Sequence, residues 1–255
     1  MSNETSSKSP FAVEQINIGA KPWQIARLKT EDVAPVLALA ATYTEKKIPH
    51  TRDESQSGEL RSHRLKYQKQ LMGSIAEITI KTLLDRYLKN QGLADQWVVN
   101  LYDSVRTDEF RSPEGEYDIR LVSARRPDVY YEVESRSSTA RDRTIAVALG
   151  KFDIIGPYES SIKKNEPLKD FYVRPLYAYL DFERRDYSPD RFQELFISGE
   201  VQLYIVGGCA RRRMIEKGFA KTMAQDATEY RVVRIRDGLD IFGFLKEVSD
   251  TLRNS

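Results

Sequence analysis

The sequence has few of the residues that build disulfides or zinc sites. It contains one cysteine, Cys209, and two histidines, His50 and His63, among 255 residues. A single cysteine has no partner within the chain, which favours a reducing, cytoplasmic setting. The usual four-ligand zinc sites need more histidine and cysteine than this chain has. Any bound metal is therefore expected to be a hard cation held by oxygen ligands.

Long apolar runs and an excess of charge of one sign are also lacking. The longest apolar stretch, at 33–41, is about half the length of a membrane span and contains Pro35. The first ten residues are polar and show no apolar core of a secretory signal. The formal net charge is +2, which does not by itself indicate a nucleic-acid partner. We therefore expect a soluble protein with no membrane segment.

Helical and strand patterns interleave along the chain. We expect a helix that starts at Thr30 and further helices at about 60–89, 139–150, 189–198, 210–223 and 240–252. Strands are expected at 97–105, 115–122, 128–136, 171–182, 201–208 and 229–237. This order predicts an α/β protein with a mixed central sheet flanked by helices. The polar segment at 48–59 is the best candidate boundary, which divides the chain into an N-terminal tail and helical appendage at 1–59 and an α/β domain at 60–255.

The strands at 115–122 and 128–136 form a predicted hairpin that gathers carboxylates. Their odd-numbered positions are apolar, whereas their even-numbered positions include Asp118, Glu132 and Glu134. Residues alternate between the faces of a strand, so a register in which paired numbers sum to about 250–252 puts both apolar sets on one face. That register sets Asp118 about 4.8 Å from Glu132 or Glu134, which lie about 6.6 Å apart along their strand.

Like charges opposite one another destabilise a sheet, so these carboxylates need compensation. A hard divalent cation with oxygen ligands is one candidate. The alternative is a surface ion-pair network in which Arg120 and Arg136 neutralise the carboxylates. From the hairpin alone, the two interpretations have about equal weight.

The helix at 60–89 adds a fourth carboxylate. Glu77 lies among apolar and small residues, four positions after Gly73. Glycine inside a helix costs about 1 kcal/mol relative to alanine, and the usual reason for it is close approach of a backbone or a ligand. We therefore expect Glu77 to face the carboxylate hairpin, with a solvated surface position as the alternative.

With these residues in place, the chain resembles the PD-(D/E)XK nuclease superfamily, which has the restriction-endonuclease-like fold. Glu77 matches that family's optional helix glutamate, Asp118 its strand aspartate and Glu132 the first residue of its Glu-x-Lys. The chain departs from the pattern at Glu134, where the family most often has lysine. The resemblance covers roughly residues 68–150, and it implies a mixed central sheet flanked by helices.

The resemblance implies a Mg²⁺-dependent DNA endonuclease, with Mn²⁺ as a substitute ion, in restriction, defence or DNA processing. Asp118 and Glu132 would hold the metal with Glu77, and Glu134 would act as ligand or general base. A homodimer is the default expectation for such enzymes. The N-terminal region is a candidate site for a protein partner.

Basic residues near the hairpin are candidates for phosphate contacts. Arg125 and Arg126 lie on its loop, and Arg136, Arg141 and Arg143 follow its second strand. Solvated surface positions are the alternative for each of them. Two other functions stay open: a catalytically inactive nuclease-fold subunit that binds nucleic acid or assists assembly, and an α/β protein whose carboxylates form only a surface network.

Overall fold

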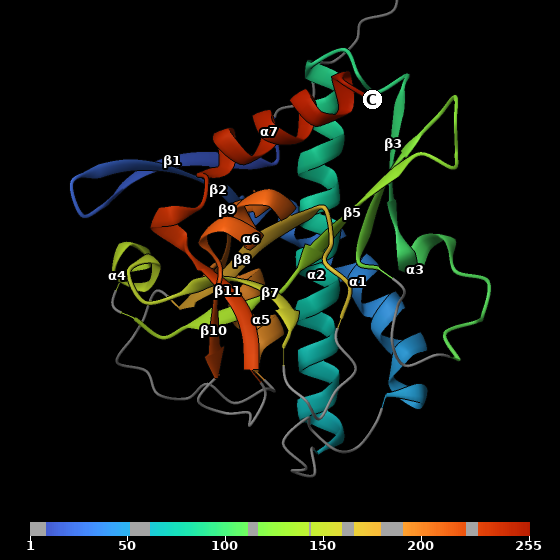
Figure 1. The fold of residues 1–255 in the computed structure, drawn as a ribbon. Coiled ribbons are helices and arrows are strands. Elements are labelled where there is room, and N and C mark those ends of the chain that lie inside the picture. Colours follow the sequence, from blue (N-terminus) through green and yellow to red (C-terminus); the bar gives the residue numbers. More distant parts are fainter. Residues whose placement is uncertain are drawn as a thin grey trace, which may run out of the picture.

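The computed structural model describes residues 9–51, 62–111, 117–142, 144–159, 166–179, 191–222 and 229–255. The fold is α/β, with a mixed, largely antiparallel central sheet flanked by helices (Figure 1). This confirms the predicted fold class. Among the described residues, no helix combines the length and apolar character needed to cross a membrane.

The central sheet has the strand order β1-β2-β9-β8-β5-β4-β3, and β6 pairs with β8 beside β5. Among the strands that the structure describes, only the pairs that β5 and β6 make with β8 are parallel. The strands are β1 (Phe11–Ile18), β2 (Lys21–Leu28), β3 (Trp97–Leu101), β4 (Ile119–Ser123), β5 (Tyr130–Ser135), β6 (Ser138–Ala140), β8 (Phe171–Tyr179) and β9 (Val201–Ala210). A second, antiparallel sheet consists of β10 (Phe219–Thr222), β11 (Glu229–Arg234) and β7 (Asp153–Tyr158).

The helices are α1 (Val33–Lys47), α2 (His63–Asn90), α3 (Tyr102–Val105), α4 (Ile145–Leu149), α5 (Phe192–Ile197), α6 (Arg211–Lys217) and α7 (Ile241–Arg253). Short 3-10 turns lie at Thr30–Asp32, Ile48–His50 and Ile235–Asp237. The hydroxyl of Ser62 accepts a hydrogen bond from the backbone of Leu65 and caps α2, because the first N–H groups of a helix have no partner within it.

Two cores lie on opposite faces of the central sheet, because successive strand residues point to opposite sides. Odd-numbered residues such as Tyr177 and Leu203 pack with α1, α2, α5 and α7 in the larger core. Even-numbered residues such as Tyr172 and Tyr204 pack with Met214 of α6 and with residues of β7 and β11 in the smaller core. Within the described chain, the smaller core takes residues from β2, β8 and β9 and none from β3, β4 or β5.

Several sequence-based boundaries differ from the structure. The helix expected at 139–150 is the short strand β6 followed by α4, and the strand expected at 97–105 ends at Leu101, where α3 begins. The sequence patterns do not indicate β1, β2 or β7, and the helix expected at 210–223 is α6 followed by the strand β10. The division of the chain near residue 59 stays a prediction, but β1 and β2 place earlier residues in the same sheet as later ones, since Ala26 pairs with Ile205.

Candidate active site

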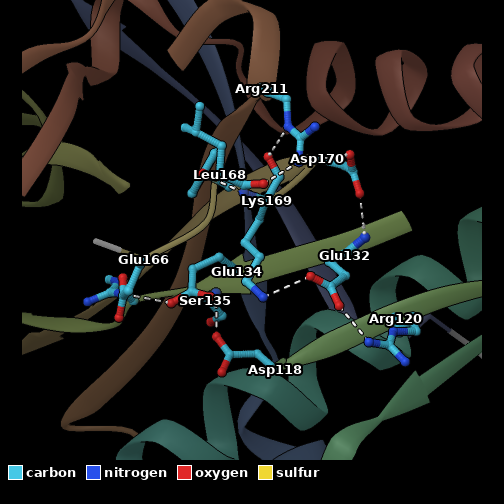
Figure 2. Close-up of polar contacts among 12 residues, drawn as sticks. Asp118, Arg120, Glu132, Glu134, Ser135, Glu166, Leu168, Lys169, Asp170 and Arg211 are labelled. Carbon is cyan, nitrogen blue, oxygen red and sulfur yellow. Dashed lines mark hydrogen bonds and ion pairs between the residues drawn. The ribbon is translucent and has the colours of Figure 1, made fainter. Parts of the chain in front are cut away.

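The predicted carboxylate hairpin forms, with its register at one end of the expected range. Ile119 pairs with Val133 and Arg120 with Glu132, so paired numbers sum to 252. The odd-numbered side chains Ile119 and Val133 are buried in the larger core. This register places Glu134, rather than Glu132, opposite Asp118. The carboxylate of Asp118 also accepts a hydrogen bond of 2.7 Å from the backbone N–H of Ser135 (Figure 2).

Asp118 lies in an unfavourable environment for a negative charge. Burial, followed by the charges of Glu134 and Glu77, raises the pKa of Asp118 well above its ordinary value. The hydrogen bond from Ser135 and the charge of Arg136 act in the opposite direction but do not cancel the effect. Asp118 therefore holds a proton far more readily than an exposed aspartate does.

Glu77 of α2 belongs to the same electrostatic cluster. Burial raises its pKa to about 7; the Lys47 ammonium opposes this, and the charges of Asp103 and Glu134 add to it. The charges of Glu77 and of the hairpin carboxylates therefore act on one another. Gly73 is not required by packing, since a methyl group at that position would lie 3.9 Å from the Glu77 Oε1 atom, an ordinary contact.

A lysine from α1 enters this cluster, and the sequence patterns did not indicate it. The Nζ atom of Lys47 forms an ion pair with Asp103 of α3 and lies 3.4 Å from the Ser74 hydroxyl oxygen. Burial would lower the pKa of Lys47, but the charges of Glu77 and Asp103 raise it overall. Lys47 therefore remains a cation beside the carboxylates and partly balances their charge.

Glu132 is committed to a different set of partners. Its carboxylate forms ion pairs of 2.6 Å with Arg120 and 2.8 Å with Lys169, and its backbone N–H donates to Asp170 (Figure 2). Burial acts to raise the pKa of Glu132, but the hydrogen bonds from Lys169 and Arg120 outweigh it and lower the pKa. These are contacts of the kind that the surface-network alternative anticipates for Arg120.

Arg136 is enclosed rather than exposed to a ligand. Its guanidinium pairs with Glu134 at 3.0 Å and with Glu166 at 2.6 Å, and it lies 4.5 Å from the ring centroid of Tyr158. Burial would lower the pKa of Arg136, but the charges of Glu134 and Glu166 raise it. The buried Arg174 donates to the Arg136 carbonyl oxygen. The ion pair with Arg136 therefore holds the Glu134 carboxylate in place.

The other predicted phosphate contacts do not gather around the carboxylates. Arg125 and Arg126 are exposed on the hairpin loop, at the opposite end of β4 from Asp118. Arg126 donates to the backbone oxygen of Ser255 at 2.5 Å. Arg141 is exposed after β6, and Arg143 lies outside the described residues.

Two features decide which residues are available to a cation. Glu77, Asp118 and Glu134 supply only oxygen ligands, which suits a hard divalent ion. However, no three Asp, Glu, His or Cys side chains within the described ranges are grouped so that they could hold a metal ion. The chemistry of the donor set fits such an ion, while the present arrangement leaves Glu132 and Glu134 in ion pairs with arginine and lysine.

Comparisons with known proteins assign no family to this chain. No family model matches the sequence, and no solved structure matches it. The chain is similar to an uncharacterized protein, MJECS01, of Methanocaldococcus jannaschii, with 26% identity over 220 residues. The match covers 79% of this chain and 78% of that protein. Any assignment of function therefore depends on the chemistry of the residues themselves.

Proposed function

We propose that the protein is a metal-dependent DNA endonuclease with Asp118, Glu134 and Glu77 as its catalytic carboxylates. One observation carries this proposal: the hairpin register sets Asp118 opposite Glu134, and burial together with the charges of neighbouring carboxylates raises the pKa values of Asp118 and Glu77. Such repulsion opposes folding, and it is retained at sites where a function requires it. A divalent cation would relieve it.

The register of the hairpin changes which residues match the motif of the PD-(D/E)XK superfamily. Because Glu134 lies opposite Asp118, Glu134 takes the position of the strand glutamate, and Arg136 stands two residues later, where the family most often has lysine. Glu132 lies two residues before Glu134 on β5 and has a structural role through its ion pairs with Arg120 and Lys169. This assignment replaces Glu132 with Glu134 as the proposed metal ligand.

Each residue of the cluster has a distinct proposed role. Asp118, Glu134 and Glu77 would hold Mg²⁺ or Mn²⁺, which would supply charge neutralisation at a phosphate and a more acidic bound water. Arg136 positions Glu134 through its ion pair. Lys47 limits the negative charge around Glu77 when no other cation is present. The proposal has further parts that come from the resemblance and the composition. They are DNA as the substrate, a homodimer, a cytoplasmic location and a protein partner for the N-terminal region.

A second candidate function is a nuclease-fold subunit that binds nucleic acid without cleaving it. The observation that favours it is the pairing of Glu132 and Glu134 with cationic side chains, together with the lack of a three-residue metal group among the described residues. In that case Arg136 and Lys169 have replaced the metal as counter-charges.

Cleavage assays separate the two functions. Supercoiled plasmid and labelled single-stranded oligonucleotides are incubated with Mg²⁺, Mn²⁺ or a chelator, and nicked products are resolved on gels. We expect metal-dependent cleavage by the wild type and a loss of at least about 100-fold in Glu134→Gln and Asp118→Asn, because even residues that only support a metal ligand typically contribute about 10- to 100-fold. Asp85→Asn, an exposed carboxylate on α2, serves as the matched control.

Cleavage that persists in both variants, or no cleavage with either ion, would refute the nuclease proposal. Binding of the same oligonucleotides without cleavage would support the second function. Thermal melting of each variant verifies that a lost activity does not reflect unfolding.

A further inference from the structure

One side of the strands β3, β4 and β5 is not covered by the smaller core. We name it the open face; it includes the side chains of Val98, Asn100, Arg120, Val122, Tyr130 and Glu132, with Glu134 at its end on β5. Cross-strand pairing arranges these residues in two rows, one through Val98, Val122 and Tyr130, and one through Asn100, Arg120 and Glu132. Val98 is 47% exposed and Tyr130 44% exposed, although the opposite side of the same strands is buried.

The Tyr130 ring is held in place by a stack of side chains. The guanidinium carbon of Arg120 lies 3.8 Å from the ring centroid of Tyr117 and 4.1 Å from that of Tyr130. Tyr117 is buried and packs edge-on against Tyr102. Arg120 is fixed from a third direction by its ion pair with Glu132. An exposed aromatic ring in a fixed orientation loses little conformational entropy when a flat ligand stacks on it.

Cationic side chains lie beside the open face. Arg120 and Lys169 form ion pairs with Glu132, and Arg211 forms one with Asp170 (Figure 2). Arg211, at 50% side-chain exposure, is the most accessible of the three cations. The half-exposed guanidinium of Arg211, 3.7 Å from the Asp170 carboxylate, is the group in this set that is open to a phosphate from solvent.

We propose that the open face binds single-stranded DNA, with one unpaired base stacked on Tyr130 and the backbone following β5 toward Glu134. This inference depends on the proposed function, for which it names the substrate class. Tyr130 and Glu134 lie on the same side of β5, about 13 Å apart at the rise of a strand. Aromatic rings combined with basic side chains are the usual means of binding single strands without sequence preference. Bases within a duplex are already stacked on their neighbours, so Tyr130 would select unpaired nucleotides.

The test measures binding separately from cleavage. The full chain is titrated, in the presence of a chelator, into a fluorescein-labelled single-stranded oligonucleotide and into the duplex of the same sequence, and fluorescence anisotropy is recorded. We expect tighter binding to the single strand, an affinity for it about tenfold lower in Tyr130→Ala, and nearly unchanged affinity in Tyr130→Phe. Phe242→Ala, which removes a 47% exposed aromatic ring on α7, is the matched control and should bind as the wild type does.

Three results would overturn the proposed base stacking: unchanged affinity in Tyr130→Ala, an equal loss in Phe242→Ala, or tighter binding to the duplex. A protein that cleaves DNA but fails this test keeps the proposed nuclease function and loses the single-strand selectivity. A protein that passes it but does not cleave supports the non-catalytic function.

Discussion

The stability of the protein should depend on pH through Glu77. The folded-state pKa of this residue is about 7, against an ordinary value of 4.5, chiefly because of burial. A raised pKa means that the folded state binds the proton more tightly than the unfolded state does. The stability associated with this proton is therefore fully present below pH 4.5 and is lost as the pH rises toward 7. The difference corresponds to roughly 3 kcal/mol above pH 7.

Replacing Glu77 with glutamine removes the charge and retains the size and polarity of the side chain. We expect Glu77→Gln to be more stable than the wild type at pH 8 by roughly 3 kcal/mol, and equal to it near pH 4. Lys47 keeps its ion pair with Asp103 in this variant, so no cation is left without a partner. Mg²⁺ should stabilise the wild type at pH 8 and have a smaller effect on the variant, because only the wild type retains the full carboxylate cluster.

Urea unfolding followed by tryptophan fluorescence measures these differences, since Trp23 and Trp97 are both buried. Asp85→Asn on the same helix is the control; its exposed ion pair with Lys81 predicts a change within about 0.5 kcal/mol at any pH. A Glu77→Gln variant that is less stable than the wild type at pH 8, or a difference independent of pH, would refute the reasoning.

Three further predictions concern the neighbourhood of the site. Glu132→Gln should destabilise the protein at pH 7 by about 1–3 kcal/mol, because two cations lose a charged partner. Since the pKa of Glu132 is lowered in the folded state, urea unfolding should show that the stability difference between variant and wild type shrinks as the pH falls below 4.5. Arg136→Lys should slow cleavage about tenfold while the protein stays folded at the assay temperature, since lysine lacks the planar fork that pairs with two carboxylates; unchanged initial rates would argue against a positioning role. Gly208→Ala should lower the melting temperature far more than Gly19→Ala, because an added methyl group at Gly208 would lie 2.3 Å from the Tyr172 carbonyl oxygen, whereas at Gly19 only the backbone conformation opposes it; similar losses would contradict this.

The local elements of the site could be predicted from sequence because their patterns are strong. The apolar alternation of β4 and β5 determined which face is buried, and therefore the register to within two residues. The apolar period of α2 placed a helix around Glu77, as the structure confirms. The helix predicted at 139–150 was wrong, because its sequence pattern is weak. This segment contains the short strand β6 and the short helix α4, and β6 forms because it pairs with β8, about 38 residues later in the chain.

The sequence by itself determined that carboxylates of α2 and of the hairpin were the candidates, because local periodicity controls which way a side chain points. It left open whether Glu132 or Glu134 faces Asp118, and it gave no sign of Lys47 or Lys169, which come from distant parts of the chain. Tertiary structure decided these points. Ion pairs and pKa shifts depend on which charges packing brings within a few ångströms, and that distance is not encoded in the spacing of residues along the chain.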